Sequence, residues 1–192
     1  MATTFAFGLA ACGDGGSSTA TTSEADDVAA GAEEEAEVNP CSPEAPAEET
    51  ALEGEPAAPG APITDVVAVD YAFEGVPETL PSGEHGFTLS GTGDEFHELA
   101  LVRVDDDRPV EEIFDLPESE QEAISEYLGG ITACPGETSA EPLGASLEPG
   151  RYVLVCFVPV GTTPDLRGDA LPAAYENPPH FTEGMVAELT VE

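Results

Sequence analysis

The sequence predicts an all-β sandwich domain that follows an acidic, disordered linker. Short runs rich in β-branched and aromatic residues, separated by Gly- and Pro-containing turns, begin at Ile63. Before them, residues 13–62 consist mainly of Ala, Glu, Gly, Pro, Ser and Thr. That composition cannot bury enough apolar surface to offset the entropy of ordering the chain. We therefore expect a tether over residues 13–62 and one folded domain over residues 63–192.

Alternating or continuous apolar segments indicate the strands of this domain. In the segment 96–104, alternation places His97, Leu99 and Leu101 on one face. In the last segment, Ala187, Leu189 and Val191 share a face. The expected strands cover residues 66–73, 87–90, 96–104, 151–158 and 185–191.

One segment does not fit a strand. Residues 117–128 contain Glu, Gln and Ala, with Ile124, Tyr127 and Leu128 at helical spacing. Pro117 suits the first turn of a helix, and Gly129-Gly130 suits its end. We expect one short helix here, inserted between strands.

The charge is strongly one-sided. The formal net charge is −36, from 40 acidic residues against four basic ones, all arginine. A protein that follows nucleic-acid phosphates needs clustered cations, and an anionic membrane surface would repel this chain. The acid is spread along the whole sequence, which is typical of a secreted protein of a halophile. At about 1 M salt the Debye length is roughly 3 Å, so the self-repulsion is screened.

At the N-terminus an apolar start leads to Leu9-Ala10-Ala11-Cys12 and then to a Gly- and Ser-rich stretch. This pattern resembles the start of a bacterial lipoprotein. In a lipobox of this kind the cysteine is lipidated after cleavage before it. No Lys or Arg precedes the apolar run, so residues 1–12 lack the charged part of a signal. A start codon placed too late would explain that, and an incidental Cys12 is the alternative. The resemblance implies an extracytoplasmic protein held at the outer face of the membrane by a lipid on Cys12.

Four side chains have the types that a mononuclear copper electron-transfer site requires. Such a site uses two imidazoles, one thiolate and a weak axial thioether. His97 opens an expected strand, Cys156 lies near the end of another, His180 follows Pro179, and Met185 starts the last strand. The thiolate donates strongly to copper, the imidazoles stabilise both redox states, and the thioether tunes the potential.

Short motifs surround these four residues. The chain shows Gly150-Arg151-Tyr152 in a strand that ends near the cysteine, then a Pro-His pair, then Gly184-Met185-Val186. These motifs resemble those of the plastocyanin-type cupredoxins. The sequence Phe-Glu-Gly-Val-Pro at 73–77 adds a likeness to bacterial cupredoxin-like lipoproteins. Over residues 63–192 the resemblance implies a Greek-key β-sandwich that binds one type 1 copper ion. It further implies a monomeric electron carrier that serves an unidentified redox partner and is not an enzyme.

Two positions depart from that family. Residues 157–179 separate Cys156 from His180, where the family has only a few residues. This Gly-, Pro- and Asp-rich insertion can loop out, since each doubling of loop length costs only about 0.6 kcal/mol. Glu98 follows His97 where many cupredoxins carry Asn, and it either orients a ligand or faces solvent. His85 lies in a Gly-flanked stretch and is expected in a surface turn.

The cysteines leave two arrangements open. If Cys12 is lipidated and Cys156 binds copper, Cys41 and Cys134 remain to pair with each other. The rival is a Cys134–Cys156 disulfide, which would remove the thiolate and leave a metal-free interaction domain. Copper delivery without a redox role is a third possibility. A Cys-His pair without a third orienting residue gives little support for nucleophilic catalysis.

Overall fold

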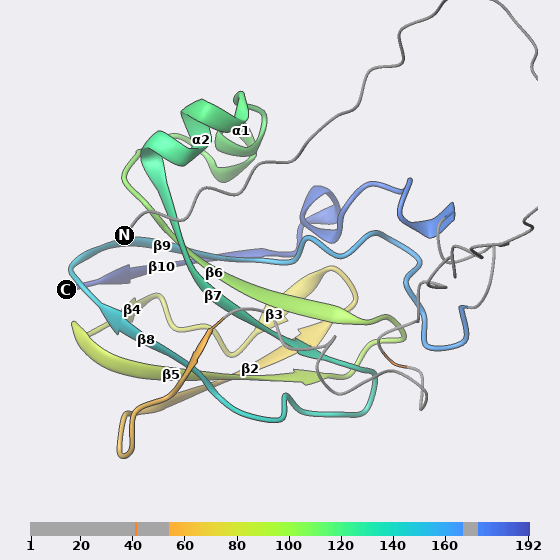
Figure 1. Cartoon of the computed structure of the whole chain (residues 1–192), viewed down its shortest axis with the longest axis horizontal. Helices are drawn as coiled ribbons and strands as arrows, with labels where there is room; N and C mark the ends of the chain where they lie inside the picture. The colour runs from red at the N-terminus through yellow and green to blue at the C-terminus, as the bar shows by residue number, and fades with distance from the viewer. Residues whose placement is uncertain (1–40, 42–53, 167–172) are drawn as a thin grey trace, which may run out of the picture. The chain divides into compact units, whose positions relative to one another are not determined.

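The predicted all-β sandwich is confirmed. The computed structural model describes residue 41, residues 54–166 and residues 173–192 (Figure 1). Cys12 and the segments 1–40, 42–53 and 167–172 lie outside the described residues, and with them most of the expected tether. None of the helices in the described ranges is long and apolar enough to cross a membrane.

Within the described part of the chain, ten strands form two sheets of five strands each. The first sheet has the spatial order β1 (Glu55–Pro56), β8 (Leu143–Leu147), β5 (Gly83–Gly91), β2 (Ile63–Val69) and β3 (Ala72–Glu74). The second has the order β4 (Thr79–Leu80), β10 (Val186–Val191), β9 (Gly150–Val155), β6 (His97–Val104) and β7 (Ser125–Ala133).

The chain passes between the two sheets several times. Most neighbouring strands are antiparallel, whereas β2 with β5 and β4 with β10 are parallel, so both sheets are mixed. Figure 1 shows β2, β3, β5 and β8 as one layer and β6, β7, β9 and β10 as the other. Among the described residues the α-helices are α1 (Val110–Phe114) and α2 (Glu118–Ile124).

The main core lies between the sheets. Phe87 and Leu89 of β5 and Leu99 and Leu101 of β6 are fully buried in it. Successive side chains of a strand point to opposite faces, so Ala100, Val102 and Val104 face away from this core. There they form a second buried cluster with Val110 and Ile113 of α1. The helical insertion therefore covers the outer face of the second sheet, beside the strands that carry the metal-site candidates.

The segment 66–73, expected as one strand, is two strands joined by a turn. β2 ends at Val69 and β3 begins at Ala72. Tyr71, between them, has φ 65°, a left-handed conformation that interrupts a strand. The turn brings Tyr71 toward the site described below.

The expected helix over 117–128 is correct only in its first part. α2 ends at Ile124, and Tyr127 and Leu128 belong to β7, which was not expected. The register of β7 against β6 shifts here because Leu128 has no partner between Tyr127 and Gly129. Gly129, with φ 133°, and Gly130 pair with Leu101 and Ala100, so they continue the strand next to this β-bulge and do not end a helix. The expectation of a single helix was also wrong, because α1 precedes α2.

Two further expectations differ from the structure. His85 is 3% exposed within β5, and its Nε2 lies 2.7 Å from the carbonyl oxygen of Pro81, so it is not a surface turn residue. Paired structure also begins before Ile63, because β1 pairs with β8. Strands β1, β4 and β8 went unrecognised in the sequence because they are short or carry small residues.

Candidate metal centre

The sheet topology brings three of the predicted ligand residues to one end of the second sheet. β9 lies between β10 and β6 and is antiparallel to both. The first residue of β6 is His97, the residue after β9 is Cys156, and the residue before β10 is Met185. The beginning of β6, the end of β9 and the beginning of β10 therefore meet at the same end of the second sheet.

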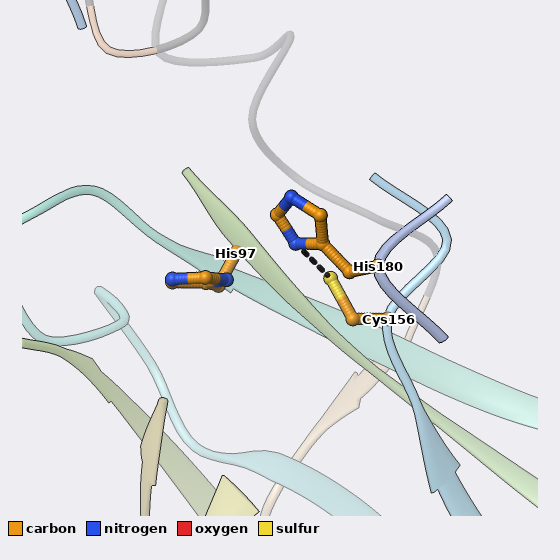
Figure 2. Close-up of side chains that lie close together, drawn as sticks. All are labelled: His97, Cys156 and His180. Carbon is orange, nitrogen blue, oxygen red and sulfur yellow. Dashed lines mark hydrogen bonds between the residues drawn. The ribbon is translucent and has the colours of Figure 1, made fainter. Parts of the chain in front are cut away.

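His97, Cys156 and His180 converge there, as Figure 2 shows. One ligand atom of each lies within 4.8 Å of the others, and all three residues are 0% exposed. His180 Nδ1 lies 3.4 Å from Cys156 Sγ. The backbone N–H of Glu98 donates to the same sulfur at 3.4 Å. These are a soft sulfur donor and two imidazoles, and all three side chains are buried.

Met185 lies next to this cluster through its backbone. Its N–H donates to His180 O at 3.1 Å, and its carbonyl accepts the Cys156 N–H at 3.3 Å. The preceding Gly184 has φ 110°, which a residue with a side chain rarely adopts, so glycine allows the turn from the 3₁₀ helix η1 (His180–Glu183) into β10. The Met185 side chain is fully buried. Its role as an axial ligand stays a prediction.

The cysteine pairing leaves the candidate thiolate free. Cys41 and Cys134 form a disulfide, while Cys156 is a buried free cysteine. The alternative Cys134–Cys156 disulfide is therefore wrong. The metal-free domain that it would have closed loses its basis.

The long insertion between Cys156 and His180 does not keep them apart. Its two ends pair with each other: His180 N–H donates to Val158 O at 2.8 Å, and Val160 N–H donates to Pro178 O at 3.0 Å. The extra residues therefore leave the sheet and return beside the point where they left. At the base of the loop, the Phe181 N–H donates to Cys156 O at 3.0 Å.

An aromatic cluster supports the ligand backbone from the side of the helices. Phe157 follows Cys156, Phe181 follows His180, and both contact Phe114 of α1. The ring centroids are 4.9 to 5.6 Å apart in tilted or edge-to-face arrangements, which are favourable for aromatic pairs. The inserted helix thus helps to fix two of the candidate ligands.

Two carboxylates approach the histidines from the side away from Cys156. His180 Nε2 lies 3.0 Å from Glu95 Oε2, and His97 Nε2 lies 3.6 Å from Asp70 Oδ1, just beyond hydrogen-bond distance. Tyr71 donates its hydroxyl to Glu95 Oε1 at 2.8 Å. No local sequence pattern marks these partners, because a single carboxylate among 40 acidic residues does not stand out.

Burial and hydrogen bonding determine the protonation of the site. Burial alone would raise the pKa of Glu95, but hydrogen bonds from Tyr71, the Gly161 N–H and His180 outweigh it and lower that pKa. Burial lowers the pKa of His97, with the nearby His180 acting in the same direction, so His97 is held neutral. Burial raises the pKa of Cys156 to about 12, so a metal that binds the sulfur must displace its proton.

Glu98 does not face solvent freely. It is partly buried, and burial raises the pKa of its carboxyl to about 7, although a hydrogen bond from the Phe157 backbone acts against the shift. Of the two options for Glu98, the structure places its side chain at the Cys156–Phe157 segment, beside the sulfur. Its backbone N–H, and not its carboxylate, contacts the candidate ligand.

The donor set fits copper. Soft thiolate together with imidazole is the combination that copper electron-transfer sites use. Both ring nitrogens of His97 are buried with no hydrogen-bond partner among the described residues, an arrangement that costs free energy unless something else binds there. A metal ion on one of these nitrogens would give that nitrogen a partner and remove its share of the cost.

The comparisons with known proteins give structural likeness only. No protein family and no curated protein matches the sequence. Similar solved structures include auracyanin B, with 18% identity over 74% of this chain and 99% of that chain at a TM-score of 0.45. Auracyanin A from Chloroflexus aurantiacus, described as a "blue" copper protein, has 15% identity over 69% and 100% at 0.41. A multi-copper oxidase from Pediococcus acidilactici has 13% identity over 71% and 27% at 0.39. The chain's own two-sheet topology, with His97 at the start of β6 and Cys156 directly after β9, fits the cupredoxin-like sandwich that the sequence motifs predict.

Proposed function

We propose that this protein binds a single copper ion of type 1 and carries electrons outside the cytoplasm. His97 and His180 supply imidazole nitrogens, Cys156 the thiolate and Met185 the axial thioether. One observation carries the proposal: three donors of the copper-binding types converge in a buried cluster, and the only free cysteine among the described residues is one of them.

The surroundings of these side chains suit electron transfer more than catalysis. Bound copper supplies a one-electron couple that cycles between Cu(II) and Cu(I). The protein's part is to keep the donors in place in both states, and the adjacent strands β6, β9 and β10 with the closed base of the 157–179 loop do so. The donors are fully buried, so a substrate has no direct access to them.

A copper titration followed by visible absorption tests the proposal. We expect one equivalent of Cu(II) to produce an intense thiolate-to-copper band, because Cys156 Sγ lies beside both histidines. Zn(II) serves as the control that fills the same donors without a visible band. Bound copper with only a weak spectrum would favour copper delivery over electron transfer. No copper uptake at all would reject both.

The compartment belongs to the same proposal. Disulfides persist in oxidising surroundings, and the Cys41–Cys134 bond therefore supports an extracytoplasmic location. There the protein acts as a monomer, held at the outer face of the membrane through a lipid on Cys12, and exchanges electrons with a redox partner protein. Its charge of −36 suits high-salt surroundings.

Detergent partitioning tests the lipid anchor. The protein expressed from a longer upstream start is expected in the detergent phase, because a diacylated cysteine adds about 0.8 kcal/mol for each buried CH₂ group. Cys12→Ser is expected in the aqueous phase. If both proteins stay in the aqueous phase, Cys12 is not lipidated.

A further inference from the structure

We propose that Glu95 is a positioning residue of the copper centre: its carboxylate fixes which nitrogen of His180 faces the metal, fastens the long loop between Cys156 and His180, and favours Cu(II) over Cu(I). This inference rests on the proposed copper function. It explains how a ligand loop of this length holds a compact site.

Glu95 receives hydrogen bonds from three separate parts of the chain. Oε2 lies 3.0 Å from His180 Nε2 and accepts the backbone N–H of Gly161. Oε1 accepts the hydroxyl of Tyr71 at 2.8 Å. The Tyr71 ring also packs edge-on against the His180 ring, with centroids 5.2 Å apart. Glu95 is only 9% exposed, so these bonds form away from bulk water, where charge-assisted hydrogen bonds are strong.

The contact with Glu95 selects the tautomer of His180. A carboxylate only accepts, so the ring proton must lie on Nε2 for this bond to form. Nδ1 then presents its lone pair on the side of Cys156 Sγ, 3.4 Å away. Histidine ligands commonly donate their second ring N–H to a carboxylate, which fixes the ring and raises the basicity of the ligating nitrogen.

The same carboxylate fastens the start of the inserted loop. The Gly161 N–H donates to the Glu95 carboxylate. The residues that follow each of them are also bonded, since the Phe96 N–H donates to Thr162 O at 2.8 Å. The far end of the loop carries His180. Glu95 therefore ties both ends of the insertion to the turn that precedes β6 and its ligand candidate His97.

A buried negative charge next to a ligand also has an electrostatic consequence. With the same ligands, a Cu(II) centre carries one more positive charge than a Cu(I) centre. The negative Glu95 carboxylate therefore attracts the oxidised centre more strongly. Removing this carboxylate weakens the binding of Cu(II) more than the binding of Cu(I). The reduction potential must then rise.

The test compares Glu95→Gln with Asp94→Asn in the whole protein. Glu95→Gln keeps the size of the side chain but removes the charge, whereas Asp94→Asn removes one charge from an exposed neighbour. For Glu95→Gln we expect the dissociation constant for Cu(II) to rise about 10- to 100-fold. Each tenfold loss of Cu(II) over Cu(I) affinity raises the potential by about 59 mV. Asp94→Asn should match wild type in both measurements.

A second measurement needs neither copper nor a variant. In the metal-free protein, ¹⁵N NMR of the histidine rings should show His180 with its proton on Nε2 and in slow exchange with water. A proton on Nδ1, or rapid exchange at Nε2, would overturn the inference, and so would equal affinities and potentials for Glu95→Gln and Asp94→Asn. If the wild type takes up copper but Glu95→Gln behaves like it, only this inference fails. If the wild type takes up no copper, the proposed function fails, and the copper part of the inference with it.

Discussion

Cys156→Ser is expected to abolish the intense visible band of the copper-loaded protein while the sandwich stays folded. A serine hydroxyl does not ionise near neutral pH and cannot replace the strong donation of a thiolate. Cys156 is fully buried directly after β9, and its sulfur accepts the Glu98 N–H. A hydroxyl can accept the same bond, so the fold should be little affected. The effect is the complete loss of the band, measured by absorption after Cu(II) titration, with far-UV circular dichroism as the check on folding.

Met185→Leu is the matched control for that substitution. It changes another buried residue at the same end of the second sheet but leaves the thiolate in place. A volume-conserving swap of this kind usually costs less than about 1.5 kcal/mol. We expect the band to remain and the reduction potential to shift, as for an axial ligand. An intense band that survives Cys156→Ser would show that Cys156 is not the copper ligand.

The sequence predicted the parts of the fold that strong local patterns specify. A continuous apolar run marks β9, and alternation marks β6 and β10. The face that Leu99 and Leu101 share was therefore predicted as the structure has it. His97 and Cys156 were singled out correctly as members of the cluster because they flank these strands. His180 required the Pro-His and Gly-Met motifs as a guide.

The sequence did not reveal the features that depend on contacts between distant segments. β7 reads partly as a helix because Ile124, Tyr127 and Leu128 happen to have helical spacing, and only its pairing with β6 decides otherwise. The turn at Tyr71 requires a positive φ that non-glycine residues rarely show. Glu95 contacts residues 24 and 85 positions away, so no local pattern marks it.

The partner of Cys134 in the disulfide depends on where the strands place each cysteine. Four cysteines allowed Cys134 to pair with either Cys41 or Cys156. In the fold, Ala133 lies opposite His97 at the end of β7, so Cys134 follows the edge strand, while Cys156 leaves the central strand β9. The fold therefore gives the two cysteines different roles. Cys134 forms a disulfide next to the edge strand β7, and Cys156 lies beside the two histidines.

Removing the Cys41–Cys134 disulfide is expected to lower the free energy of unfolding by about 4 kcal/mol. The bond joins residues 93 positions apart, and a closed loop of about 100 residues is worth roughly 4.7 kcal/mol in the chain-entropy model, within the usual range of about 2 to 5 kcal/mol. The double variant Cys41→Ser/Cys134→Ser, compared with wild type by guanidinium unfolding of the metal-free proteins, measures the loss. For a chain of this size that loss lowers Tm by roughly 8–16 °C.

The copper site should survive this loss, which separates the disulfide's role from that of Cys156. β7 pairs with β6 at eight positions, from His97↔Ala133 to Val104↔Ser125, and none of these pairs needs the cross-link. We therefore expect the double variant to show the same intense band as wild type at a temperature where both are folded. A loss below about 1 kcal/mol would show that the cross-link does not constrain the unfolded chain. Loss of the band in a folded double variant would mean that the edge strand β7, and not the inner strands β6, β9 and β10, holds His97 in place.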